Sequence, residues 1–275
     1  GPEGNGETLS PTPDPRPPTP LYRYRATFEK GEQVKYLSHL DMTRALPRAF
    51  RRAKVRLGYS QGFHPMPLVQ YGPALGVGAV GHNELIDFDS FDELDEAEFL
   101  ERLNASLPSG FRFKRLERLQ SASQSLSKEV NRADWQVALD APEMQSALAR
   151  LRAGRAALRS VDKSEIHQLL ADEFMAHESY VIERVRKEKR QRIDVRRYTK
   201  ALRIDAATGG LVITTEVTPQ GGVKPIEVAA AIYELTEGEK LSISSRVRRL
   251  RLYQETPALT GTPGATDAAA SASMQ

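Results

Sequence analysis

The 275-residue chain contains no cysteine. Neither a disulfide framework nor an iron–sulfur cluster held by cysteine thiolates can therefore form on it. No run of 18 apolar residues is present, which argues against a membrane-spanning helix, and the proline-rich start lacks the pattern of a signal peptide. We therefore expect a cytoplasmic protein without membrane association, and any iron–sulfur chemistry linked to it must come from another polypeptide.

Motifs of metal, phosphate-transfer and acyl-transfer enzymes are also missing. The five histidines show no HExxH spacing, and no GxSxG elbow occurs. The glycine-rich stretch 72–81 lacks the Lys-Ser/Thr pair of a phosphate-binding loop. The sequence therefore predicts no metal and no cofactor, and it favours a binding protein over an enzyme without excluding catalysis.

Composition divides the chain into tails and folded parts. Residues 1–20 hold seven prolines and residues 255–275 are rich in Ala, Ser, Thr and Gly, so both are expected to be disordered. Both tails are net acidic, so the folded part is more basic than the formal charge of +3 indicates. We predict an N-terminal domain at 21–120, a linker at 121–132 and a C-terminal domain at 133–254.

The order of expected elements gives the fold class. In the first part we expect strands at 22–29 and 111–118, helices at 39–54 and 94–106, and extended segments near 55–59, 68–72 and 84–89. In the second part we expect strands at 134–139, 176–186, 200–206, 211–217 and 246–253, with helices at 143–153 and 225–235. Each part reads β-α-β-β-α-β, so the prediction is an α+β fold of two tandem ferredoxin-like (RRM-like) domains.

The stretch 36–67 is the densest in functional side chains. Ser38 and Asp41 have the spacing of a capping box at a helix start. An apolar stripe with spacings of three and four follows, and four arginines fall off that stripe: Arg44, Arg48, Arg51 and Arg52. The arginines form either a solvated helix face or a face that contacts phosphates, to which guanidinium groups are well matched.

A loop rich in glycine and proline follows this helix, at 58–67. It carries Tyr59, Phe63 and His64. Loop aromatics can stack on bases, and a nearby histidine can donate to phosphate. The alternative is that Phe63 fills the core and His64 bonds to backbone carbonyls.

A second basic region spans residues 184–203, where ten of twenty residues are Lys or Arg. Interleaved apolar residues predict a strand hairpin that projects a positive ridge, either solvated or in contact with a phosphate backbone. The surrounding arginines suggest that Asp194 organises ion pairs. The candidate RNA contacts in this ridge are Arg186, Lys187, Lys189, Arg190, Arg192, Arg196 and Arg197.

Four residues are weak candidates for catalysis. His39 and Asp41 fall on the first turn of the predicted helix, and His64 and Tyr59 would join them if the loop folds back. A metal-independent RNA cleavage would then use His64 or His39 as the proton carrier.

The run from Phe28 to Asp89 strongly resembles a bacterial family of radical-SAM-linked proteins. The resemblance extends over about residues 21–254, weakens after residue 120, and departs at Pro47. Members are fused to, or encoded beside, radical SAM enzymes, so the resemblance implies a partner and no reaction. The matching pieces are Phe28–Lys30, Leu37–Asp41, Arg44, Arg51–Ala53, Tyr59–Pro65, Pro73–Gly78 and Glu84–Asp89.

Three functions remain open at this point. The first is an RNA-binding accessory protein that presents structured RNA, tRNA or rRNA, to a radical SAM partner. The second is a metal-independent endoribonuclease, because the expected order of elements also resembles the tandem RRM-like fold of CRISPR repeat-processing endoribonucleases. The third is a protein-interaction module that docks an acidic partner.

Overall fold

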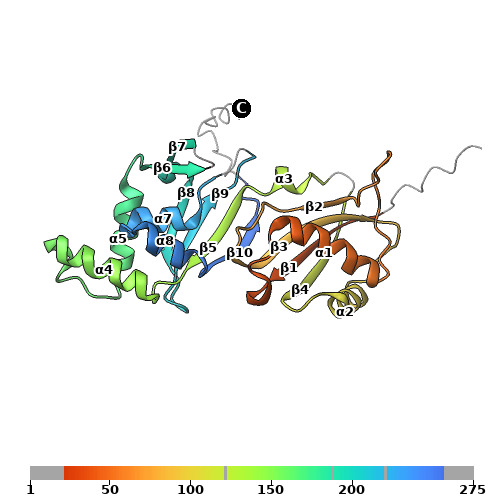
Figure 1. The fold of residues 1–275 in the computed structure, drawn as a ribbon, viewed down its shortest axis with the longest axis horizontal. Coiled ribbons are helices and arrows are strands. Elements are labelled where there is room, and N and C mark those ends of the chain that lie inside the picture. Colours follow the sequence, from red (N-terminus) through yellow and green to blue (C-terminus); the bar gives the residue numbers. More distant parts are fainter. Residues whose placement is uncertain (1–21, 121–122, 187–188, 220–221, 257–275) are drawn as a thin grey trace, which may run out of the picture.

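The computed structural model describes residues 22–120, 123–186, 189–219 and 222–256. It has a mixed α+β fold built on one large, mostly antiparallel sheet with the strand order β4-β1-β3-β10-β5-β9-β8. A short strand, β2, pairs with β3, and a separate hairpin is formed by β6 and β7. Figure 1 shows an elongated molecule with the first half of the chain at one end and the second half at the other.

The N-terminal half packs two helices on its part of the sheet. Tyr24, Ala26 and Phe28 alternate along β1 and are buried, as expected for a strand with one face on a core. Phe50 of α1 lies edge-on to Phe88, with ring centroids 4.9 Å apart. The elements of this half are β1 (Tyr22–Lys30), η1 (Glu32–Val34), α1 (His39–Arg52), β2 (Val69–Tyr71), β3 (Val80–Ser90), α2 (Glu96–Ser106) and β4 (Phe111–Leu119).

The segment between the halves is tied to the sheet. Leu126 of the short helix α3 (Leu126–Glu129) is fully buried. Arg23 donates to the carbonyl of Ser123 at 3.0 Å, and Arg25 pairs with Glu129 at 2.9 Å. The described part of the predicted linker is therefore packed against the N-terminal half.

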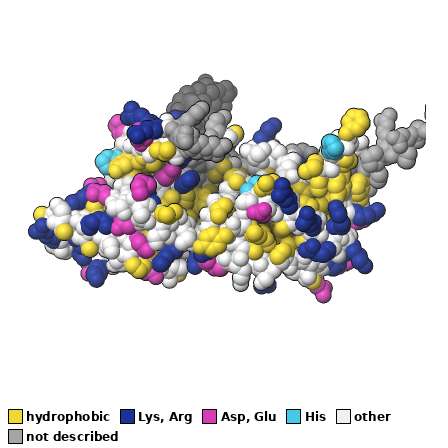
Figure 2. Space-filling model, in the orientation of Figure 1, with side chains coloured by type: hydrophobic (Ala, Val, Ile, Leu, Met, Phe, Trp, Pro, Cys, Tyr) yellow, Lys and Arg dark blue, Asp and Glu magenta, His cyan; other side chains and the backbone are white. Residues whose placement is uncertain are grey.

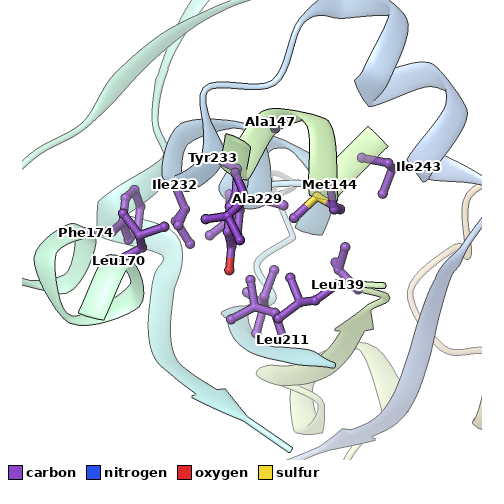
Figure 3. Packing of buried hydrophobic residues seen from close by; sticks show 14 of the residues in the cluster. Leu139, Met144, Ala147, Leu170, Phe174, Leu211, Ala229, Ile232, Tyr233 and Ile243 are labelled. Carbon is purple, nitrogen blue, oxygen red and sulfur yellow. The ribbon is translucent and has the colours of Figure 1, made fainter. Parts of the chain in front are cut away.

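The C-terminal half has its own core, in which helices cover its strands. Figure 3 shows Met144 of α4, Phe174 of α5, Tyr233 of α7 and Ile243 of α8 among the side chains around Leu139 and Leu211. The elements are β5 (Arg132–Val137), α4 (Pro142–Gly154), η2 (Ala156–Leu158), α5 (Ile166–Ala176), β6 (Val181–Arg186), β7 (Lys189–Asp194), α6 (Val195–Tyr198), β8 (Thr199–Ile204), β9 (Leu211–Glu216), α7 (Pro225–Tyr233), α8 (Glu237–Ser244) and β10 (Val247–Tyr253).

The two halves meet where β10 pairs in parallel with the start of β3. Arg249 of β10 is 1% exposed and holds both carboxylate oxygens of Glu84 in β3, with 2.8 Å between Nε and Oε1. Its guanidinium also donates to the carbonyl of Pro73 and lies over the Trp135 ring. A buried, bidentate ion pair therefore joins the two halves.

The observed elements correct the expected ones in several places. Helix α1 ends at Arg52, two residues before the predicted end, and it runs unbroken through Pro47. Helices α5 and α8 were not expected, and the strand predicted from residue 176 begins only at Val181. The predicted tails lie outside the described residues, apart from residues 255 and 256. Within the described part of the chain, no helix is long and apolar enough to cross a membrane.

Candidate functional site

Helix α1 presents three arginines to solvent. Its N-terminus has the predicted capping box, in which Asp41 N–H donates to Ser38 Oγ at 3.2 Å and Ser38 N–H donates to Asp41. Met42, Leu46, Ala49 and Phe50 are buried, which turns the opposite face outward. We call Arg44, Arg48 and Arg51 the α1 basic face, because spacings of four and three place them on one side of the helix.

None of these three guanidinium groups has an acceptor among the described residues, and all three are exposed. Figure 2 shows Lys and Arg side chains gathered over α1 with few acidic ones beside them. Arg52 differs, because it donates to the carbonyl of Ser106 at 2.5 and 3.2 Å and so holds the end of α2. The α1 basic face is therefore free for an external anion, whereas Arg52 is committed to the fold.

Residues 58–68, here called the aromatic loop, form a braced hairpin after α1. Ser60 N–H donates to the Met66 carbonyl at 2.8 Å, Met66 N–H returns to Ser60 Oγ at 3.0 Å, and Leu68 N–H donates to the Gly58 carbonyl at 2.8 Å. Gly62 has φ of +130°, a conformation that side chains disfavour. These bonds hold the loop in one shape.

The aromatic loop turns its large side chains outward. Phe63 is fully exposed, Met66 is 66% exposed and Tyr59 is 39% exposed, and His64 is exposed as well. The alternative in which Phe63 fills the core is therefore wrong. Exposed aromatic and thioether groups of this size on a braced loop are typical of a contact surface.

The four catalytic candidates are not brought together. The Asp41 carboxylate accepts from Ser38, which lowers its pKa, and it makes no bond to His39. His64 and Tyr59 lie beyond the C-terminal end of α1, and His39 lies at its N-terminal end. Thirteen residues of helix separate the two ends by about 20 Å at 1.5 Å per residue. Among the described residues, no hydrogen bond, ion pair or ring contact joins the loop to His39.

His39 instead lies edge-on to Tyr71, with ring centroids 5.5 Å apart and the planes at 81°. His39 Nδ1 and the Tyr71 hydroxyl are both buried, and neither has a hydrogen-bond partner among the described residues. Burial, followed by the positive charge of Arg249, lowers the pKa of His39, and burial raises the pKa of Tyr71. A neutral imidazole therefore lies beside a protonated phenol.

Lys30 is a further buried group in this region that the sequence did not indicate. It is 2% exposed, and its Nζ donates to the carbonyls of Lys35 at 3.1 Å and Leu37 at 2.7 Å. Burial lowers its pKa, with Arg249 acting in the same direction and Glu84 against it. The sequence gives no local sign that Lys30 is buried beside Glu84 and Arg249, because these two residues are 165 positions apart in the chain.

The β6–β7 hairpin carries the first part of the second basic region. A hairpin was predicted, but its second strand is β7, which was not expected, and the strand predicted at 200–206 is β8 of the large sheet. Figure 1 places the β6–β7 hairpin in the half of the molecule opposite α1. Two of its arginines are paired inside the protein: Arg184 with Glu227 at 2.5 and 2.7 Å, and Arg190 with Glu183 at 3.1 Å. Arg192 is exposed and has no partner among the described residues. Lys187 lies outside the described residues, as do the side chains of Arg186 and Lys189.

Of the two arginines just after the hairpin, one is bonded inside the protein and the other is exposed to solvent. Arg196 donates to the carbonyls of Met175 and Thr199, each at 3.1 Å. Arg197 is exposed and lies over the Tyr198 ring. The Asp194 carboxylate accepts the backbone N–H groups of Tyr180, Arg196 and Arg197 and caps α6. The expectation that Asp194 organises arginine ion pairs is therefore wrong. In the described part of the chain no group of acidic and histidine side chains could hold a metal ion.

The fold and these surfaces define an α+β protein with a basic helix face, a braced aromatic loop and a second basic hairpin. The chain belongs to a family described as "Uncharacterized protein conserved in bacteria (DUF2344)", whose model matches residues 23–251. A solved structure titled "Crystal Structure of an Unknown Protein from Galdieria sulphuraria" is 11% identical over 86% of this chain and 99% of its own, with a TM-score of 0.24. That likeness is too low to bear on the fold. No curated protein matches the chain.

Proposed function

We propose that the protein is a cytoplasmic RNA-binding accessory protein that presents tRNA or rRNA to a radical SAM modifying enzyme. The observation that carries the RNA part is the α1 basic face, which has three unpaired guanidinium groups on one side of a helix. Paired arginines would be unavailable to phosphates, whereas these three are free to make two-point contacts with them.

The arrangement of strands supports a fold of two ferredoxin-like domains, at 21–120 and 133–254, joined by 121–132. The N-terminal half has the strand order β4-β1-β3-β2, and the C-terminal half has the order β10-β5-β9-β8. In both halves the first strand lies between the third and the fourth, and the second strand lies outside the third. Two RRM-like sheets in one chain suit RNA recognition, although fold alone does not give function.

The protein partner rests on the resemblance of the run Phe28–Asp89 to radical-SAM-linked proteins. An apolar surface near the start of α1 supports a protein contact there. Tyr36, Leu40 and Val77 are 67%, 57% and 62% exposed. Exposed apolar side chains that gather on one surface are typical of protein interfaces. The proposed partner would supply the iron–sulfur cluster, since this chain has no cysteine.

Binding of a tRNA transcript over a salt series tests the RNA part. We expect the logarithm of the association constant to fall steeply and linearly with the logarithm of salt concentration. Polyglutamate of matched charge serves as the control for an acidic protein partner. If polyglutamate binds as tightly as the transcript, or if no RNA binds, the protein-interaction module becomes the better reading.

A second candidate is RNA cleavage by acid–base chemistry, favoured by the pair of His39 and Tyr71. A neutral imidazole can accept the proton of a 2′-hydroxyl, and a protonated phenol can donate to a leaving oxygen, once RNA binding exposes these two buried groups. His39→Ala should then abolish cleavage and leave the affinity for RNA unchanged. Absence of cleavage by the wild-type protein with any structured RNA ends this candidate.

A further inference from the structure

A cavity of about 210 Å³ lies at the base of the aromatic loop. One side is formed by Ser60 and Met66 of that loop, and β2 contributes Gln70. The lining also includes Arg23 of β1 and Asp87 and Asp89 of β3. An enclosed cavity of about 150 Å³ holds benzene in another protein, so this one is large enough for a single nucleobase.

The acidic residues of the cavity differ in their partners. Asp87 is buried and is neutralised by Arg25, at 2.7 and 3.0 Å, and by Arg23 at 3.2 Å. The carboxylate of Asp89 is half-buried, and no donor among the described residues reaches it. Burial raises the pKa of Asp89, Arg23 lowers it and Asp87 raises it further. The cavity therefore offers one carboxylate whose acceptor capacity is unused.

This chemistry selects the part of a nucleotide that can enter. A phosphate would meet the unpaired carboxylate of Asp89, while the Arg23 guanidinium is already bonded to Asp87, so a phosphate is disfavoured. A base edge that carries an amino group would donate to the free carboxylate, as cytosine N4 does to acidic side chains in nucleic-acid complexes. Met66 adds a polarizable thioether at the rim, a group that packs well on aromatic rings.

The loop above the cavity supplies a second contact. Phe63 projects from the loop with its ring fully exposed, although the loop beneath it is braced by three hydrogen bonds involving Ser60, Met66, Gly58 and Leu68. An aromatic ring held away from the protein can stack on any base, and such stacking is worth about 1–3 kcal/mol per base.

We propose that this cavity binds one unpaired nucleobase with an exocyclic amine, that Asp89 is its hydrogen-bond acceptor, and that Phe63 stacks on the adjacent base. The inference rests on the proposed RNA-binding function and narrows it to RNA with an unpaired adenine, cytosine or guanine beside a helix. The α1 basic face then holds the backbone, and the aromatic loop selects the unpaired nucleotide.

The test uses the full chain and three RNA stems of equal length at one salt concentration. One stem is fully paired, one has a bulge of two cytosines, and one has a bulge of two uracils, so that a second unpaired base is available to Phe63. We expect the cytosine bulge to bind about tenfold more tightly than the paired stem and several-fold more tightly than the uracil bulge, because a good base contact contributes about 1–3 kcal/mol.

Two variants separate the two contacts. Asp89→Asn keeps the shape but presents an amide that can donate as well as accept, so the cytosine-to-uracil ratio should fall toward one. Phe63→Ala should weaken both bulged stems about equally and keep that ratio. Leu169→Ala, which removes another exposed apolar side chain in the C-terminal half, should change neither. Circular dichroism and denaturant unfolding confirm that each variant is folded.

The outcomes distinguish this inference from the function on which it rests. Equal binding of paired and bulged stems by the wild-type protein overturns the cavity proposal and leaves RNA binding standing. An unchanged cytosine-to-uracil ratio in folded Asp89→Asn removes Asp89 from the site. Failure of all three stems to bind removes the RNA-binding function itself.

Discussion

Helix α1 and strand β10 are both rich in arginine, yet most of their arginines differ in what they contact. In α1, Arg44, Arg48 and Arg51 are exposed and have no acceptor in the described part of the chain. In β10, Arg249 is buried against Glu84 and Arg251 is bonded to Asp134 at 2.7 Å. The density of positive charge in a sequence therefore does not report how much of it is available to a ligand.

The difference follows from where the carboxylates lie. A strand inside a sheet has a neighbouring strand on each side. In this fold β3 supplies Glu84 to Arg249, and β5 supplies Asp134 to Arg251. A helix that packs one face on a core leaves its other face without neighbours. Guanidinium groups on that face remain unpaired unless the helix itself carries acids at neighbouring positions, and α1 has only Asp41, which is used for capping.

The largest expected effect comes from breaking the buried pair. Arg249→Met leaves the Glu84 carboxylate buried without its partner, which should lower the free energy of unfolding by about 3–5 kcal/mol. Urea denaturation followed by circular dichroism measures the loss. The Trp135 ring lies over Arg249, so its fluorescence reports the same transition from the junction between the halves.

A double variant tests the cause of that loss. Arg249→Met combined with Glu84→Leu removes both charges, so most of the stability should return. If the double variant is as unstable as the single one, lost packing and not the unpaired charge explains the effect. If Arg249→Met unfolds at the wild-type urea concentration, the ion pair does not hold the halves together.

The next effect concerns the arginines of α1. Replacing Arg44, Arg48 and Arg51 by glutamine should change the free energy of unfolding by no more than about 0.5 kcal/mol, because no contact is lost. RNA affinity should fall, and the slope of its logarithm against that of salt should decrease by about 2–3, close to one for each lost phosphate contact.

A matched triple variant controls for net charge. Arg112 and Arg115 of β4 and Arg159 in the C-terminal half are also exposed. Replacing these three by glutamine removes the same charge from other surfaces and should leave the salt slope close to that of the wild type. Equal losses for the two triples would mean that α1 has no special role in binding RNA.

The features of α1 and β10 that can be predicted from the sequence are those formed by residues close together in the chain. Helix α1 was predictable because its capping box and its apolar stripe, including Met42, Leu46 and Phe50, lie within a few turns of one another. The same spacing in Ile166, Leu170 and Phe174 marks α5, so that helix was readable and was missed. Two predicted contacts, Arg52 and Arg196, turned out to bond to backbone carbonyls from other elements.

The parts that the sequence does not predict depend on distant pairing. Residues of like parity in a regular strand share a face, but in β10 the register shifts between Arg249 and Arg251. Arg249 pairs with Trp135 and Arg251 with Asp134, which are consecutive residues and so point to opposite faces. Strand alternation cannot reveal a bulge, and no pattern reveals the exposure of Phe63 in a loop without periodicity.

The smallest effect concerns an arginine that lies between these two extremes, paired but accessible. Arg150 is 48% exposed and donates to both oxygens of Glu239 at 2.6 and 2.8 Å. The bond from Arg150, with further bonds from Thr236, lowers the pKa of Glu239 to about 2. In the unfolded chain this carboxyl titrates near its ordinary pKa of 4.5. Between these two values the unfolded state binds more protons, so the stabilisation is complete above pH 4.5 and is lost as the pH falls toward 2.

Arg150→Gln should therefore lower the free energy of unfolding by less than about 1 kcal/mol at pH 7, as for most exposed pairs. The difference in unfolding free energy between wild type and variant should stay constant above pH 4.5 and narrow as the pH falls toward 2, since protonation of Glu239 removes its attraction to Arg150. Arg159→Gln should show a difference that does not vary with pH, because among the described residues its guanidinium donates to the carbonyl of Ala153 and to no carboxylate. A difference for Arg150→Gln that stays constant at low pH as well would mean that packing of its aliphatic stem, and not its charge, stabilises the fold. The contributions of Arg249, Arg150 and the α1 basic face to stability would then follow how deeply each side chain is buried and not whether it is paired.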